Sequence, residues 1–503
     1  MDVDLSLVIV LVVGALSGLL AQALRLPKVL GMIFAGVVLA PALSLGVTTA
    51  CKDPSNPTSP ASTMRTMALL LALARGAFGL DFSVVANVKL TVGMLAVAPF
   101  FVELLVEAAV AWAVLPASSG IGGTSPIRVA FLAAALWASL SPSLVIPNML
   151  TIIDDEKSTS PAPHVILCAA PLEVAAALVA YGAMESGVES VVAGESSLSL
   201  LLVPIWLVLS VVLGVALAFA LRAWRLVRDH EVVVKVIGKA LPAEQLLTLL
   251  AIYLFAYSVC TPYYAKNLTA VVAALACVLG VRVLSPELAE MAGPQLKVGW
   301  AFAEVLLFVM TGVVVRGAID SRSEAFSGGF FAVLLLGNLS RLVVDVFVAV
   351  VWHGQVQRAA ATLLSPAEFK DESRASLLAD ESDVAADNAD EPKREWWRDV
   401  AARAAFMWAT TTPKATVQAA LGGAPAASYI ALGITQATGA FIQQSSAISI
   451  LYCATIGSLL THSLGRYLLK TALAAPRKTE AVPVKAAIEF ISQPPTEIVS
   501  GTH

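Results

Sequence analysis

The chain has 503 residues, of which 58% are hydrophobic and 14% charged, and its mean hydropathy is +0.81. Soluble domains carry about 25% charged residues, so this composition excludes an ordinary soluble fold and makes a lipid bilayer the solvent of most of the chain. The net charge of −4 gives no support to nucleic-acid binding, and the five cysteines have no metal-binding spacing.

Apolar runs long enough to cross a bilayer, about 17–25 residues, recur along the chain. We expect an all-α polytopic membrane protein with thirteen transmembrane helices, at residues 5–24, 29–46, 66–82, 88–115, 127–152, 163–184, 199–221, 244–262, 267–284, 298–318, 328–352, 404–421 and 444–470. Lys and Arg are about four times as frequent in the loops of one side, which places the C-terminus in the cytoplasm. The sequence leaves open the plasma, endosomal and mitochondrial inner membranes.

Two hydrophilic segments lie outside these spans. Residues 358–403 are acidic and poor in aromatics, which predicts a disordered cytoplasmic loop. Residues 471–503 form a cytoplasmic tail. Neither segment has the size or pattern of a soluble catalytic domain, so a transporter is favoured over an enzyme.

Four charged residues, Glu103, Glu173, Arg341 and Lys414, fall near the middle of predicted spans. A charge at the bilayer centre costs roughly 2.5–3.5 kcal/mol on insertion scales, so each of the four needs a partner or a function. Glu103 and Arg341 are expected to form a buried ion pair, with Asp345, four residues further on, as a competing partner. Lys414 either takes part in function or neutralises helix ends.

Glu173 has a different setting, because no other charge lies between His164 and Met184. We therefore expect Glu173 to lack a stable partner. A buried carboxylate of this kind is pushed toward its neutral form, which either a proton or a bound cation can provide. This chemistry suits a proton-coupled cation carrier.

Prolines interrupt two of the predicted spans. The fifth, FLAAALWASLSPSLVIPNMLTI, contains Pro142 and Pro147, and the twelfth contains Pro413 after three threonines. A proline removes a backbone donor, and freed backbone groups are tolerated in a membrane only beside protein or a watery cavity. The two spans are seven apart, so their orientations are opposite, as in the inverted repeats of transporters.

We expect the two breaks to line an ion site. The hydroxyls of Ser141, Thr411 and Thr412, together with backbone carbonyls, would supply oxygen ligands to a Na⁺ or Li⁺ ion held by Glu173.

Six stretches resemble a known family. RLPKVLGMIFAG (25–36) resembles the start of the second helix of monovalent cation/proton antiporters. Five others resemble the eukaryotic NHA-type sodium/proton antiporters of that superfamily: ARGAFGLD (74–81), APFFVELLVEAA (98–109), SPSLVIPNML (141–150), PKATVQAALG (413–422) and IGSLLTHSLGRYLL (456–469).

The resemblance implies a homodimer in membrane lipid that exchanges Na⁺ or Li⁺ for H⁺ by elevator-like alternating access in pH homeostasis, with no cofactor. Dimerisation helices would occupy 1–65 and 199–300. A core ion-transport domain, with two crossed, unwound helices, would comprise 66–184, 301–357 and 404–470. The resemblance also pairs Glu103 with Arg341 and places Lys414 on the second crossing helix.

One departure from the family concerns its Asp-Asp pair on the sixth span. The corresponding residues here read PLEV, with Glu173 as the single carboxylate. One titrating acid predicts electroneutral exchange of one cation for one proton. Two other functions stay open: proton-coupled transport of an organic solute, and a transport-inactive membrane scaffold or sensor that acts through 358–403.

Overall fold

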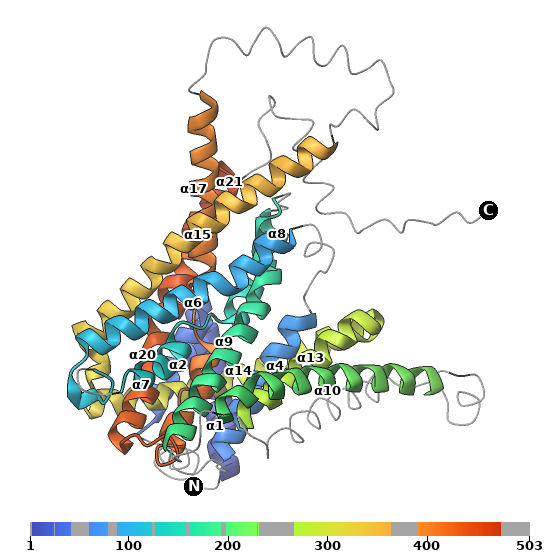
Figure 1. Ribbon diagram of the computed structural model, residues 1–503. Coiled ribbons are helices and arrows are strands. Elements are labelled where there is room, and N and C mark those ends of the chain that lie inside the picture. Colours follow the sequence, from blue (N-terminus) through green and yellow to red (C-terminus); the bar gives the residue numbers. More distant parts are fainter. Residues whose placement is uncertain are drawn as a thin grey trace, which may run out of the picture.

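The computed structural model describes the chain as a bundle of helices (Figure 1). It describes residues 3–24, 26–41, 60–78, 88–122, 126–156, 160–192, 198–228, 230, 266–363 and 391–473. The α-helices of the first half are α1 (Val3–Ala23), α2 (Lys28–Leu39), α4 (Pro60–Phe78), α6 (Lys89–Val114), α7 (Ile127–Trp137), α8 (Pro142–Glu156), α9 (Ala162–Val192) and α10 (Leu198–Arg228). A 3₁₀ turn, η1 (Ala117–Ser119), follows α6.

The second half is helical as well. Its α-helices are α13 (Lys266–Leu284), α14 (Pro286–Asp320), α15 (Gly328–Leu363), α17 (Glu391–Thr411), α18 (Thr416–Leu421), α19 (Ala424–Ala427), α20 (Gln436–Leu460) and α21 (Arg466–Thr471). A 3₁₀ turn, η2 (Glu324–Phe326), precedes α15, and a π-helical turn, η3 (Thr461–Gly465), joins α20 to α21. The described residues contain no strand.

Helices occupy twelve of the thirteen predicted spans, and the remaining span, 244–262, lies outside the described residues. Within the described part, seven helices are long and apolar enough to cross a membrane. The prediction of an all-α polytopic membrane protein is therefore confirmed.

The helices pack in two groups. In the first, α14 packs against α1, α2 and α4, and α13 links α4 to α10. In the second, α6 packs along α15 and also contacts α7 and α9, while α15 packs against α17. Figure 1 shows α10 beside α13, apart from the crossing of α15 and α17.

Burial separates the interrupted fifth span from the outer helices. In the most apolar window of Ile127–Ile153, 94% of residues are buried, whereas only 22% are buried in that of Leu207–Arg228. Because a broken helix leaves backbone groups that lipid cannot hydrogen-bond, it must be enclosed by protein. The α7–α8 pair therefore lies at the centre of the fold.

The prediction of a disordered loop over 358–403 is wrong at both ends of that range, because helices extend into it. Residues 358–363 continue α15, and α17 begins at Glu391, so only 364–390 lie outside the described residues. Before residue 358, α15 contacts the first half of α17. Asp399 bonds His353 and Arg403, each at 2.8 Å, and the Arg403 guanidinium lies 4.7 Å from the ring centroid of Trp352.

Candidate functional site at the helix crossing

Two helix breaks meet at the centre of the fold. The first separates α7 from α8 at residues 138–141, and the second separates α17 from α18 at residues 412–415. The backbone N–H of Ser141 donates to the carbonyl of Pro413 at 2.9 Å, which joins one break directly to the other. The predicted pair of crossed, unwound helices is thus confirmed.

The three predicted break prolines have different roles. Pro142 is the first residue of α8, where its missing N–H costs no helical hydrogen bond, and Pro413 lies within the second break. Pro147 lies inside α8, which continues through it, so the prediction that Pro147 breaks the helix is wrong. A bulkier residue at Gly457 of α20 would not fit beside the second break, because its Cβ would approach the Pro413 nitrogen to 2.6 Å.

Gln418 closes the carbonyl end of α7. Its side-chain amide, from α18, donates to the carbonyls of Leu136 at 2.8 Å and Ser139 at 2.5 Å, with a longer contact of 3.4 Å to Trp137. The last carbonyls of a helix have no partner within it, so this buried end of α7 needs donors from elsewhere in the chain. The sequence prediction does not include Gln418, although a glutamine in the apolar half-helix TVQAAL is itself a signal of a buried polar role.

Hydroxyl groups fill the crossing. The Ser141 hydroxyl lies 2.7 Å from that of Thr416 and 3.0 Å from that of Ser143, and the last two are 2.5 Å apart. All three side chains are buried. Ser141 therefore lies at the crossing as predicted, and Ser143 and Thr416 join it there without having been predicted.

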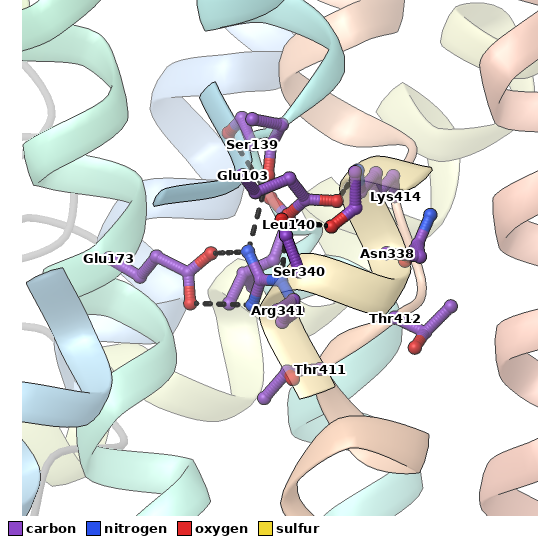
Figure 2. A network of polar contacts seen from close by, with 12 residues as sticks. Glu103, Ser139, Leu140, Glu173, Asn338, Ser340, Arg341, Thr411, Thr412 and Lys414 are labelled. Carbon is purple, nitrogen blue, oxygen red and sulfur yellow. Dashed lines mark hydrogen bonds and ion pairs between the residues drawn. The ribbon is translucent and has the colours of Figure 1, made fainter. Parts of the chain in front are cut away.

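The hydroxyls of Thr411 and Thr412 bond backbone carbonyls of α17. Their hydroxyls donate to carbonyls one turn earlier in α17, at Met407 (2.8 Å) and Trp408 (2.6 Å). Figure 2 shows Thr411 on the Arg341 side of the break and Thr412 further from Glu173. Among the described hydrogen bonds, none joins two of the four predicted ligands, Glu173, Ser141, Thr411 and Thr412, so their binding of one ion stays a prediction.

A buried ion network lies beside the crossing (Figure 2). Arg341 of α15 donates from Nε to Glu103 of α6 at 2.7 Å, which confirms the predicted pair. Its two terminal nitrogens bond the two carboxylate oxygens of Glu173 of α9, one of them at 3.1 Å. One of these nitrogens also lies 3.3 Å from the carbonyl of Ala138, at the first break.

The expectation that Glu173 lacks a partner is therefore wrong. Glu173 and Arg341 are 168 residues apart, so the apolar neighbours of Glu173 along its own helix say nothing about the base that reaches it. Both side chains are fully enclosed, with exposures of 1% and 0%. A two-pronged contact of this kind is the strong form of an arginine–carboxylate pair.

Lys414 extends the network on the other side of Glu103. Its ammonium group contacts Glu103 at 2.5 Å and Glu107 at 3.3 Å, and all three side chains are 0% exposed. The structure binds Lys414 to two carboxylates of α6. Whether it takes part in function or neutralises helix ends, as expected from the sequence, stays a prediction. Gly337 allows this close packing of α6 and α15, because a Cβ there would lie 2.6 Å from an oxygen of Glu107.

Asp345 is buried near the same network but forms no hydrogen bond with the part of the chain that the structure describes. The guanidinium of Arg341, for which Asp345 was expected to compete, is occupied by Glu103 and Glu173. Neither carboxylate oxygen of Asp345 has a hydrogen-bond partner among the described residues. The cluster thus contains four acids but only two bases, and such an excess of buried carboxylates favours the binding of protons or cations.

Comparison with known proteins shows which solved structure has a similar fold. No model of a known protein family matches the chain, and no curated protein sequence does either. The structure is similar to that of the sodium proton antiporter MjNhaP1 from Methanocaldococcus jannaschii, with a TM-score of 0.61 and 16% sequence identity. The match covers 94% of this chain and 100% of the other. The chain is therefore an integral, multi-pass membrane protein with the fold of that antiporter.

Proposed function

We propose that the protein is a secondary-active antiporter that exchanges Na⁺ or Li⁺ for H⁺, and not an enzyme. The fold, the crossed helix breaks and the buried acids beside them support this function together. The likeness to the eukaryotic NHA-type antiporters belongs to the same proposal, since only the fold is shared with the solved antiporter at 16% identity.

The observation that carries the proposal is the position of Glu173. Its carboxylate is buried beside the first break, and its partner Arg341 also reaches the carbonyl of Ala138 in that break. A cation that enters the crossing can replace the guanidinium on Glu173, while Ser141, Thr411, Thr412 and freed carbonyls offer further oxygen ligands after a local rearrangement. Oxygen atoms are the ligands that hard cations prefer.

Competition for Glu173 couples the two ions. A bare carboxylate in the membrane interior is costly, so Glu173 moves across only when its charge is balanced. A cation and a proton compete to provide this balance, and Arg341 holds the carboxylate in the absence of both. Exchange of one cation for one proton leaves the net charge of the core unchanged, so transport is electroneutral.

Alternating access would move the core domain against a dimerisation domain. We assign 66–184, 301–357 and 404–470 to the core, and 1–65 with 199–300 to the dimerisation helices of a homodimer. The exposed apolar face of α10, which includes Val208, Val212 and Phe219, suits contact with lipid or with a second copy.

Flux measurements in liposomes test the function. Purified protein is reconstituted with a pH-sensitive dye inside, and Na⁺ or Li⁺ is added outside. We expect the wild type to move protons out of the liposomes as the cation enters, at a rate that does not depend on the membrane voltage. Glu173→Gln should lose this flux by at least tenfold, whereas Glu287→Gln, at a side chain that is 85% exposed, should not.

Two results would contradict the proposal. Proton flux driven only by an organic solute would show a solute carrier on the same fold, although Arg341 and Lys414, the bases expected to face such a substrate, are already bonded to carboxylates. Folded wild-type protein that moves no ion under any gradient would favour a transport-inactive scaffold or sensor.

A further inference from the structure

The function proposed above leaves Asp345 without a role. This residue lies on α15 one turn after Arg341, is 0% exposed, and has no hydrogen-bond partner for either carboxylate oxygen among the described residues. An ionised carboxylate buried without a partner costs several kcal/mol, more than most single interactions can offset. This arrangement therefore favours the neutral, protonated form of Asp345.

The charged groups around Asp345 come from three helices. Arg341 of its own helix, Glu103 of α6 and Glu173 of α9 lie within its electrostatic range. Of the other charges on the helices packed against α15, Glu107 contacts Lys414, and Asp399 pairs with His353 and Arg403. Lys89 of α6 and Arg398 of α17 are exposed. Within the described part of the chain, Arg341 is the base positioned to serve Asp345.

Arg341 uses different nitrogen atoms for its two carboxylate partners. Its Nε bond to Glu103 anchors the side chain, and its two terminal nitrogens hold Glu173. Residues four apart on a helix are neighbours on its surface, so the terminal nitrogens can turn from Glu173 to Asp345 while Glu103 keeps its bond. Glu173 and Asp345 are thus alternative partners of one guanidinium.

We propose that Asp345 is the proton-binding carboxyl of the exchange cycle, with Arg341 alternating between Glu173 and Asp345. This inference rests on the antiport proposed above. With no cation bound, Arg341 holds Glu173 and Asp345 keeps its proton. When a cation binds Glu173, Arg341 turns to Asp345, and the proton leaves the carboxyl as Arg341 takes over its charge. Cation and proton then compete through Arg341, and this indirect competition replaces the direct competition for Glu173 described above.

The charges balance in both states. Without the cation, Glu173 is negative, Arg341 positive and Asp345 neutral. With the cation, two negative carboxylates face Arg341 and the bound ion. One cation enters for each proton released, so the sum is unchanged and transport is electroneutral. Beside the break, α9 provides a single carboxyl, that of Glu173. Asp345 thereby supplies a second carboxyl from α15.

Titration calorimetry on purified protein tests the inference. Na⁺ binding is measured in two buffers of different ionisation enthalpy, which gives the number of protons released per cation bound. We expect about one for the wild type. Asp345→Asn should release none and bind Na⁺ at least tenfold more weakly, because Arg341 loses its alternative partner. Release of about one proton by this variant would overturn the inference.

A matched control is Asp320→Asn, which removes a surface carboxylate paired with Arg316 at 3.0 Å and should behave as wild type. Should Asp345→Asn not fold, infrared difference spectra of the wild type decide the question. Na⁺ should abolish the carbonyl stretch of a protonated carboxyl, and ¹³C-labelled aspartate should shift that band. A shift with labelled glutamate alone would overturn the inference.

Failure of the two proposals can be told apart. Wild-type protein that neither binds Na⁺ nor exchanges it for protons overturns the proposed function and this inference together. Wild-type antiport that persists unchanged in Asp345→Asn overturns the inference alone.

Discussion

Replacement of Glu103 by glutamine tests the energetics of the buried network. Glu103 is 0% exposed and accepts hydrogen bonds from two cations, Arg341 at 2.7 Å and Lys414 at 2.5 Å. Breaking a buried ion pair by removing one partner costs about 3–5 kcal/mol, because the remaining charge is left uncompensated. Glutamine keeps one oxygen acceptor, and Glu173 and Glu107 still face the two cations, so we expect a loss of about 3 kcal/mol in the free energy of unfolding.

Unfolding of purified protein by increasing SDS, followed by tryptophan fluorescence, measures this difference. The control is Glu287→Gln, which removes an exposed carboxylate 3.3 Å from Arg225 and should change stability by less than about 1 kcal/mol. Added salt should not reduce the effect of Glu103→Gln, since a pair buried from solvent is little screened. A Glu103→Gln protein within about 1 kcal/mol of wild type would show that Glu103 does not hold the two cations as an ionised group.

Two further predictions concern Gln418 and Asp399. Gln418→Ala leaves the terminal carbonyls of α7 without their donor, and we expect a loss of about 2–4 kcal/mol in the same SDS assay; wild-type stability would show that another group satisfies them. Burial alone would raise the pKa of Asp399, but hydrogen bonds and charge from His353 and Arg403 hold it below the ordinary 3.8. Asp399→Asn should therefore cost about 1 kcal/mol at neutral pH, and this difference from wild type should vanish in thermal melts as pH falls below about 3.8. A difference that grows toward acid pH would refute the assignment.

The overall fold could be predicted from the sequence because lipid imposes simple rules. Spans must be apolar and about 20 residues long, and helix breaks must be enclosed, so Pro142 and Pro413 identify the crossing. The pairing of Glu103 with Arg341 could also be predicted, since both charges fall near the middle of their spans and each needs a partner. These are patterns of spacing and depth, which the order of residues records directly.

Contacts across the bundle could not be predicted in the same way. Arg341 bonds two carboxylates, those of Glu103 and Glu173. No pattern in the sequence around Glu173 indicates that it is the second partner of Arg341. Thr411 and Thr412 were expected to face a cation, but a threonine hydroxyl within a helix readily bonds a carbonyl one turn earlier. Which oxygen atom faces the crossing depends on the rotation of each helix about its axis, which short, uniformly apolar segments do not define.

The bond between Gln418 and the end of α7 joins segments that are made far apart in time. Leu136 leaves the ribosome 282 residues before the glutamine whose amide will satisfy its carbonyl. Until then the interrupted fifth span has exposed backbone acceptors, so it cannot rest stably in lipid. We therefore expect a nascent chain that stops before Gln418 to hold this segment in the insertion machinery or beside water, and to release it into the bilayer only after the second break has been synthesised.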